Sequence, residues 1–456
     1  MTGSATQSCP LNVICPVVFV PGIMGSRLRN ASTKQVVWDP GASSWSQAWD
    51  TIGLATSGAA AKKRMLIGGP GSSFSPGYLE VAHHRSGWRA DRGRNGLLGT
   101  YLPFLDWLAR DEVTRIDGCV VMIRFMVWAY PYNWTDSNRA SAAGLGAVVA
   151  EAGAVASKEA ERLNRQSMKP ILVTHSMGGL VARGYTQLLG KASDVHGVIH
   201  GAMPTHGSPE LYKRIRGGFE GATRHVLGSD QAQVTATAAN MPGPLELAPN
   251  RVYKDVPGRK PWLRALDGVG NKLWELPRAD PYAEIYANAV DWYRLVDRSL
   301  LDPGGNPTKA WTACLRQINK ARSFHVPLEN NAYHPNTRMF YGTARKTRDH
   351  VAWRPMERFA GAYPVNPVAN ASSGRVSLRG SNPNDPGGPK TFSRTLQMDG
   401  PKAQGDGTVQ AGSGLHVNQM SVAVTDGFEH QGAYDSREAR DLTRDWLVAM
   451  VKEAVA

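Results

Sequence analysis

Hydrophobic positions along the chain follow two patterns, short continuous apolar runs and longer stretches with helical spacing. Residues 15–20 and 119–130 are continuous apolar runs, as expected for strands buried on both faces of a sheet. Between residues 141 and 165, apolar side chains recur every three or four positions, which predicts a helix with one buried face. The alternation continues through a strand at 171–173, a helix at 180–189 and a strand at 195–203. This order predicts an α/β fold with a mostly parallel sheet and helical crossovers.

Two stretches interrupt this alternation. Residues 210–335 lose the pattern and carry several tryptophans, so we interpret them as a cap inserted over the sheet. Residues 41–94 are also irregular and form a candidate lid. We therefore expect one catalytic domain, residues 1–456, with two inserted segments.

The pattern returns near the C-terminus. A short strand is predicted at 338–342, and the segment 361–390, rich in Gly, Pro, Asn and Ser, has the composition of a surface loop. A strand at 420–425 and a terminal helix follow. Asp435 as N-cap, with Glu438 three residues later, predicts a capping box at the start of this helix.

The chain is strongly basic. It has 52 Lys and Arg against 38 Asp and Glu, a formal net charge of +14, which favours anionic surfaces such as phospholipid headgroups or nucleic acid. It has no zinc-finger spacing or RNA-binding signature, so nucleic acid is not favoured as a partner. Peripheral contact with an anionic membrane remains the expectation, and a solvated basic face is the alternative.

The first sixteen residues lack the basic start of a signal peptide. The longest apolar runs are interrupted by Pro21 and Arg124, and they are shorter than the ~20 residues of a membrane span. We expect a protein that is cytoplasmic as synthesised and has no transmembrane segment, with secretion by a signal-independent route as an alternative.

One short motif carries candidate chemistry. Ser176 lies in the sequence Thr-His-Ser-Met-Gly-Gly, between a buried strand and a predicted helix, where a nucleophile elbow belongs. Gly178 and Gly179 suit a tight turn, whereas Thr174 replaces the usual first glycine. The context favours Ser176 as a nucleophile over an ordinary helix start.

A serine nucleophile needs a base and an orienting acid, in the chain order Ser, acid, His for this kind of fold. Asp406 lies between two glycines, and His430 lies in the loop between the last strand and the terminal helix. We predict these two as the triad partners of Ser176. The rivals are Asp399 or Asp426 for the acid and His416 for the base.

Acyl transfer also needs backbone N–H groups that stabilise an oxyanion. The residue after the nucleophile, Met177, is predicted to supply one. The loop Pro-Gly-Ile-Met-Gly after the first strand is predicted to supply the other, from Ile23.

Several motifs in the same order along the chain resemble those of the lecithin:cholesterol acyltransferase family. They are residues 17–28, Val37-Trp38-Asp39-Pro40, Tyr130-Pro131-Tyr132-Asn133-Trp134, the Ser176 elbow, Phe340-Tyr341-Gly342-Thr343 and residues 405–409. The resemblance covers the catalytic core but not residues 210–335. It implies an α/β-hydrolase fold with cap and lid, a phospholipid or other fatty acyl ester as substrate, and no metal or other cofactor.

The chain also departs from that family. Thr135 stands where relatives commonly carry a basic residue, and no cysteine pair brackets the lid candidate. The expected function is therefore hydrolysis of lipid acyl esters, of lipase or phospholipase A type, through an acyl-enzyme. The alternatives are an O-acyltransferase that uses an alcohol acceptor, and a non-catalytic lipid-binding module on the same fold.

Overall fold

The computed structural model describes most of the chain from residue 11 to residue 455. The described ranges are 11–26, 28–30, 36–38, 57–67, 79–81, 101–116, 119–219, 227–255, 258–330, 332–358, 363, 365–372, 374–381, 391–400, 402–415 and 420–455. Most of the lid candidate, 41–94, lies outside these ranges, as does His416. The division into lid and cap therefore stays a prediction.

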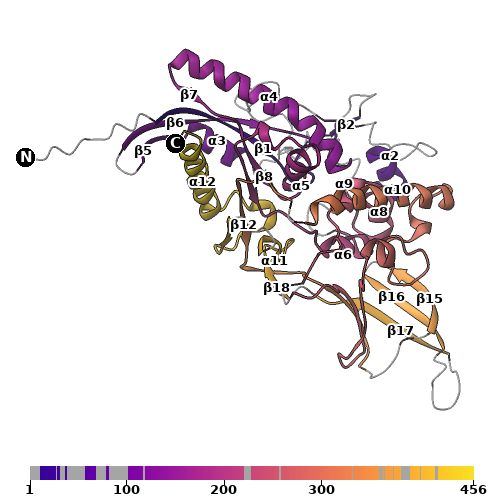
Figure 1. The fold of residues 1–456 in the computed structure, drawn as a ribbon. Helices are drawn as coiled ribbons and strands as arrows, with labels where there is room; N and C mark the ends of the chain where they lie inside the picture. Colours follow the sequence, from indigo (N-terminus) through magenta and orange to yellow (C-terminus); the bar gives the residue numbers. More distant parts are fainter. Residues whose placement is uncertain are drawn as a thin grey trace, which may run out of the picture.

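Eight strands of the described residues form the central sheet (Figure 1). In spatial order they are β19 (Met420–Val424), β12 (Thr337–Gly342), β9 (Gly197–Gly201), β8 (Ile171–His175), β1 (Leu11–Val20), β6 (Cys119–Ala129) and β5 (Glu112–Ile116), with the short β7 (Gln166–Ser167) also paired to β1. All pairings are parallel except that of β5 with β6. Every residue of β8 and β9 is buried, which explains their continuous apolar runs.

Helices cover both faces of this sheet. On one face lie α4 (Asn138–Leu163) and α5 (Met177–Arg183), and on the other α3 (Leu102–Arg110) and α12 (Arg437–Val455). Alternate residues of β1 divide between the two layers, because Val18 packs with the α4 side and Val17 with the α12 side. The predicted α/β fold with a mostly parallel sheet is confirmed.

Helix α4 matches a membrane span in length and composition, with a mean hydropathy of 1.4 over its most apolar window. Its side chains Leu145, Val149 and Ala152 are, however, buried in the same cluster as Val18 of β1. Core helices of soluble proteins pass the same test. We interpret α4 as a core helix.

The segment between β9 and β12 contains several helices. Its main helices are α6 (Glu210–Gly217), α8 (Gln231–Ala236), α9 (Pro242–Leu245) and α10 (Pro307–His325). Helix α2 (Ala59–Leu66), from within the lid candidate, contacts α8. Lys63 of α2 forms an ion pair of 2.7 Å with Asp302, ahead of α10.

A second sheet joins two distant stretches of sequence. Its order is β11 (Lys272–Leu276), β10 (Leu263–Leu266), β14 (Val351–Pro355), β17 (Thr391–Met398), β16 (Arg375–Ser381) and β15 (Val365–Ser372). Strands β15 and β16 fall inside the segment 361–390, so the surface loop predicted there is wrong over residues 365–372 and 375–381. In β16 only Val376 and Leu378 are buried, and Arg375, Ser377 and Arg379, which alternate with them, are exposed. A strand with one polar, exposed face therefore had the composition of a loop.

Three smaller elements complete the set of described strands and α-helices. Strands β2 (Leu28–Asn30), β3 (Val36–Trp38) and β4 (Leu79–Val81) form one small sheet, β13 (Arg345–Thr347) pairs with β18 (Ala403–Gly405), and α11 (Gly412–Leu415) is a single turn.

The predicted capping box of the terminal helix is wrong. Ser436 caps α12, because its Oγ accepts the Ala439 N–H at 3.0 Å. Glu438 instead accepts the backbone N–H groups of Thr425 and Asp426. The carboxylate therefore ties the helix to the end of β19.

Candidate active site

Ser176 lies in the tight turn between β8 and α5, with φ 50° and ψ −124°. A non-glycine residue with positive φ is strained and needs support from its surroundings. The Ser176 N–H donates to the Gly201 carbonyl at 2.9 Å, which supports the turn. A Cβ on Gly178 would lie 2.2 Å from the Val20 carbonyl oxygen, so only glycine fits there. The local structure thus presents Ser176 at the carboxyl edge of the sheet.

Thr174 is accommodated in the elbow although glycine is usual there. Its side-chain oxygen lies 2.9 Å from Nδ1 of His200, and its carbonyl accepts the Tyr434 hydroxyl at 3.0 Å. Both polar groups are therefore satisfied although Thr174 is fully buried.

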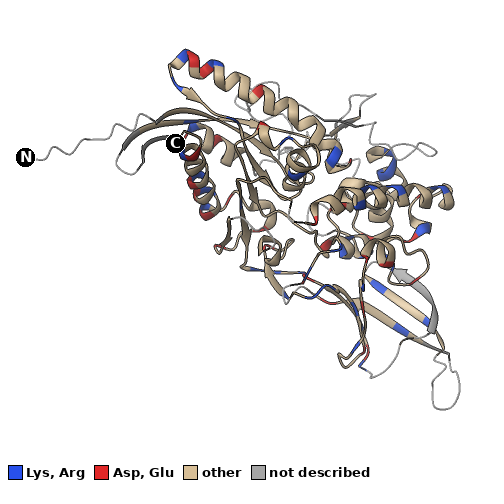
Figure 2. Ribbon diagram, viewed as in Figure 1, with Lys and Arg blue, Asp and Glu red and all other residues tan. Residues whose placement is uncertain are grey.

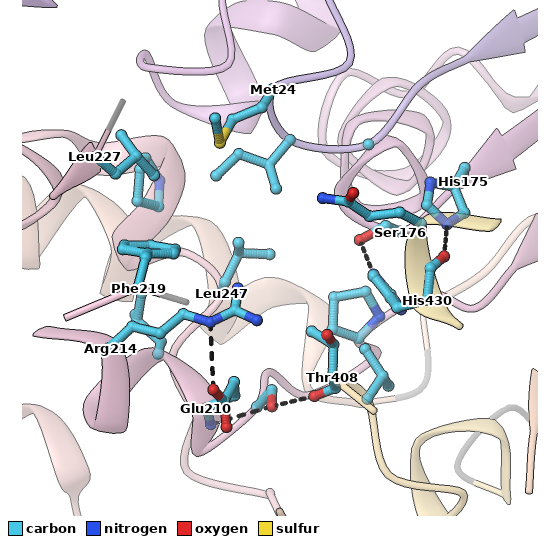
Figure 3. Close-up of a pocket in the computed structure, with 18 of the residues that line it drawn as sticks. Met24, His175, Ser176, Glu210, Arg214, Phe219, Leu227, Leu247, Thr408 and His430 are labelled. Atoms are coloured by element: carbon cyan, nitrogen blue, oxygen red, sulfur yellow. Dashed lines mark hydrogen bonds and ion pairs between the residues drawn. The ribbon is translucent and has the colours of Figure 1, made fainter. Parts of the chain in front are cut away.

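The structure brings Ser176, Asp406 and His430 together, and Figure 3 shows the contact between Ser176 and His430. Nε2 of His430 lies 2.8 Å from Oγ of Ser176, and Nδ1 lies 2.7 Å from Oδ2 of Asp406. Because a carboxylate only accepts hydrogen bonds, Nδ1 carries a proton, and Nε2 of the neutral ring can accept the serine proton. This is the geometry of a serine nucleophile with its base and orienting acid.

The Asp406 carboxylate is buried and held on both oxygens. Oδ1 accepts the N–H groups of Thr408 and Val409 at 2.9 and 2.7 Å, so Oδ2 is left for His430. The Asp406 carbonyl also accepts the His430 N–H at 2.9 Å. The loops of the acid and the base are thus joined through backbone as well as side chain.

The rival acids are engaged elsewhere. Asp399 forms ion pairs with Arg354 and Lys402 beside the second sheet. Asp426 accepts the Ser436 hydroxyl at 2.5 Å, close to the start of α12.

Two residues of the site were missed from the sequence, Tyr101 and His175. The Tyr101 hydroxyl accepts the Gly22 N–H at 3.2 Å and lies 2.5 Å from Nδ1 of His175. Nε2 of His175 donates to the His430 carbonyl at 2.8 Å. Burial lowers the pKa of His175 to about 3, with the nearby His430 ring as the second cause, so the imidazole stays neutral.

This relay connects the loop after β1 with the loop that carries His430. A neutral His175 has one donor and one acceptor, and the relay uses both. His175 is adjacent to Ser176 and could have been singled out from the sequence. Tyr101 precedes α3 and belongs to none of the motifs, so only the fold reveals it.

The loop after β1 contains Ile23. The Gly25 N–H donates to the Gly22 carbonyl at 3.0 Å, which closes a turn around Ile23 and Met24, and Met24 has φ 62°. Ile23 lines the pocket beside Ser176, and the buried Met177 begins α5. Both residues predicted to supply oxyanion donors therefore lie next to the nucleophile in sequence or in space.

Three aromatic side chains hold this loop by hydrogen bonds to its backbone carbonyls. Trp38 Nε1 donates to the Met24 carbonyl at 2.7 Å, and the Tyr132 hydroxyl donates to the Pro21 carbonyl at 2.9 Å. Trp134 Nε1 donates to the Ser26 carbonyl at 3.2 Å. The tryptophan and tyrosine motifs of the sequence thus hold the candidate oxyanion loop in place.

A pocket opens from Ser176 and encloses roughly 930 Å³, including solvent at its mouth. Most of its described lining is apolar, and Met24, Phe219, Leu227 and Leu247 lie on the wall away from Ser176 (Figure 3). Glu210, Arg214 and Thr408 form a polar part of the same pocket. Within the described ranges, no group of three or more His, Cys, Asp or Glu residues is arranged to hold a metal ion.

The mostly parallel sheet, its flanking helices and the strained serine turn define the α/β-hydrolase fold. Comparison with solved structures agrees. The chain is similar to Tle4 in the crystal structure of the Tle4–Tli4 complex, with 26% identity, a TM-score of 0.72, and coverage of 98% of this chain and 100% of that chain. No protein-family model and no curated protein sequence matches the chain. The α/β-hydrolase fold that the lecithin:cholesterol acyltransferase resemblance implied is therefore confirmed, whereas membership of that family stays a prediction.

Proposed function

We propose that this protein is a serine-dependent hydrolase of lipid acyl esters, of lipase or phospholipase A type. One observation carries the proposal. Ser176, His430 and Asp406 form a continuous hydrogen-bonded chain, with contacts of 2.8 and 2.7 Å, at a largely apolar pocket. The likeness to Tle4 along almost the whole chain supports an α/β-hydrolase with the same overall design.

The first half-reaction forms an acyl-enzyme. Ser176 Oγ attacks the ester carbonyl carbon while Nε2 of His430 takes the hydroxyl proton. Asp406 stabilises the imidazolium and holds the ring in place. The proton then passes from His430 to the leaving alcohol oxygen as the ester C–O bond breaks.

The oxyanion of the tetrahedral intermediate needs donors that are already in place. We assign this role to the backbone N–H groups of Met177, at the start of α5, and of Ile23, in the braced loop. Because the loop is held by Trp38, Tyr132 and Trp134, it needs little reorganisation during the reaction.

Water completes the cycle by attacking the acyl-enzyme, with His430 as base and then acid. An alcohol in place of water would make the protein an O-acyltransferase, and the triad serves both reactions equally. The intact Ser176, His430 and Asp406 geometry argues against a non-catalytic lipid-binding module.

The proposal includes two kinds of partner. Helix α10 carries exposed Lys309, Arg316 and Lys320 and no acidic residue, and Figure 2 colours the basic positions along its ribbon blue. Such a face favours contact with anionic lipid, which salt would weaken. Since Tle4 was solved in a complex with Tli4, a protein partner is also part of the proposal.

The compartment in which the protein acts is also a proposal. The protein is made in the cytoplasm, and it either acts there or leaves by a signal-independent route. Detection of the protein in culture medium, against a cytoplasmic marker, would decide between the two.

A hydrolysis screen tests the function. Phospholipids, acylglycerols and short-chain esters are incubated with the protein and with Ser176→Ala, with and without an added alcohol. We expect free fatty acid from the wild type only. A new ester formed with the alcohol in preference to free acid would favour the acyltransferase, and equal activity of Ser176→Ala would reject the proposal.

A further inference from the structure

The pocket beside Ser176 has two chemically different parts (Figure 3). One is lined by Met24, Leu227 and Phe219 and suits an acyl chain. The other is formed by Glu210, Arg214 and Thr408, and an acyl chain gains nothing from it. A substrate that fills both parts must carry an apolar chain and a polar group.

Arg214 of α6 is held in a fixed position in the polar part. Its Nε donates to Oε1 of Glu210 at 3.3 Å, and its guanidinium carbon lies 5.1 Å from the centre of the Phe219 ring. Its side chain is 28% exposed, so it is only partly solvated. These contacts engage Nε and one face of the guanidinium and direct its terminal nitrogens into the pocket (Figure 3).

A structural arginine in the same molecule uses its nitrogens differently. Arg183 is buried and donates from all three nitrogens to the carbonyls of Ala332, Thr205 and Leu328. Arg214, within the described residues, makes no such set of bonds from its two terminal nitrogens. This difference indicates that, among the described residues, the terminal nitrogens of Arg214 are available to a ligand.

The charges around Glu210 favour an anion. Its carboxylate lies 3.3 Å from Arg214, 3.3 Å from Arg348 and 4.0 Å from Lys213. Arg214 and Arg348 share this one carboxylate, so these three side chains carry a formal charge of +1 at this wall. In a partly buried pocket this excess attracts a negative group more strongly than it would in bulk water.

We propose that Arg214 binds the phosphodiester of a glycerophospholipid substrate, while the acyl chain lies against Met24, Leu227 and Phe219. The inference rests on the proposed function and adds the residue that selects charged lipids. A guanidinium fork suits phosphate because two N–H groups can bind two oxygens at once. Neutral acylglycerols reach Ser176 as well, but without this contact.

The test compares two lipids with the same chains, dihexanoyl phosphatidylglycerol and dihexanoylglycerol. In Arg214→Gln we expect kcat/KM for the phospholipid to fall at least tenfold and kcat/KM for dihexanoylglycerol to stay within about twofold. Lys213→Gln is the matched control, because it removes a cation beside the same carboxylate but does not line the pocket. It should leave both values within about twofold.

Binding separates this inference from the proposed function. In the Ser176→Ala background, Arg214→Gln should weaken calorimetric binding of dihexanoyl phosphatidylglycerol at least tenfold, whether or not the wild type turns it over. Equal losses for both lipids, no loss for either, or the same selective loss in Lys213→Gln would overturn the proposal. Inorganic phosphate that binds as tightly as the phospholipid would assign the site to the free anion and overturn the lipid assignment.

Discussion

The two large sheets of the molecule have different compositions and different tasks. The central sheet is mostly parallel, and its strands β8 and β9 are buried along their whole length. Ser176 follows β8 directly, and His430 lies in the loop after β19. The second sheet is mostly antiparallel, with one exposed face along β16, and none of the three proposed triad residues belongs to it.

The second sheet instead supports the pocket wall. Trp353 of β14 donates to the Tyr212 hydroxyl at 3.1 Å, and Arg216 lies over the Trp353 ring. Tyr212 and Arg216 thus attach α6 to this sheet, while Glu210 and Arg214 of the same helix line the pocket. The central sheet therefore positions the proposed reacting groups, and the second sheet positions the wall that we propose selects the substrate.

Replacing one aspartate in each region tests this division of tasks, and it should give the largest change in kcat. Asp406→Asn should lower kcat by about 10⁴, because an amide cannot hold His430 in the required tautomer. Asp399→Asn, beside the second sheet, should change kcat less than about twofold. Steady-state kinetics on one short ester measures both, and a large loss in Asp399→Asn would reverse the assignment.

Two glycines compare the packing of the two regions. Gly178→Ala should cost about 3 kcal/mol of unfolding free energy, since the new Cβ would lie 2.2 Å from the Val20 carbonyl oxygen. Gly374→Ala, before β16, should cost about 1 kcal/mol, because only its φ of 72° opposes a side chain. Urea unfolding curves give both values, and equal costs would contradict the tighter packing of the elbow.

Two buried histidines, one in the central sheet and one in helix α10, should make the protein sensitive to acid. Burial lowers the pKa of His200, in β9, to about 3 and that of His325, in α10, to about 4. Because the folded pKa is depressed, this stability is fully present above pH 6.5 and is lost as the pH falls below it. At pH 5.5 each histidine should lower the free energy of unfolding by about 1.4 kcal/mol, because it is protonated only in the unfolded chain.

The single variants His200→Gln and His325→Gln show whether the central sheet and helix α10 unfold together. Between pH 7.5 and pH 5.5 the wild type should lose unfolding free energy, and each variant should lose less by the contribution of the histidine it lacks. Urea unfolding at the two pH values measures this difference. An effect of His200→Gln alone would mean that the helical segment with α10 unfolds separately. If neither variant changes the pH dependence, the histidines are not its cause.

Removing the Tyr101 hydroxyl from the relay should have the smallest effect of these substitutions. Tyr101→Phe removes the hydroxyl between Gly22 and His175, which should lower kcat about fivefold by loosening the positions of His430 and the Ile23 loop. The KM should not change, because the phenyl ring still fills its place. A raised KM with constant kcat would indicate a role in binding instead.

The central sheet and the elbow could be predicted because their signals are local. A strand buried on both faces is a continuous apolar run, and the Ser176 motif is contained in one strand, one turn and one helix. Asp406 and His430 followed from chain order and their loop context. The structure brings both to Ser176, whereas the alternative acids Asp399 and Asp426 are bonded elsewhere.

The second sheet and the residues of the pocket wall could not be predicted in the same way. Strand β10 pairs with β14 across more than eighty residues, and the exposed face of β16 resembles a loop in composition. Arg214 is one of several basic residues in α6, and only its direction relative to Glu210 and Phe219 sets it apart. Such information depends on tertiary contacts that a single sequence does not reveal.

Covalent labelling of the nucleophile tests the central claim most directly. The protein is treated with a fluorophosphonate, digested and analysed by mass spectrometry, alongside Ser176→Ala and His430→Ala. We predict one adduct on Ser176 in the wild type, none in Ser176→Ala, and labelling slowed by at least a hundredfold in His430→Ala. An adduct on another serine, or ester turnover by protein that Ser176 labelling does not inactivate, would contradict the account.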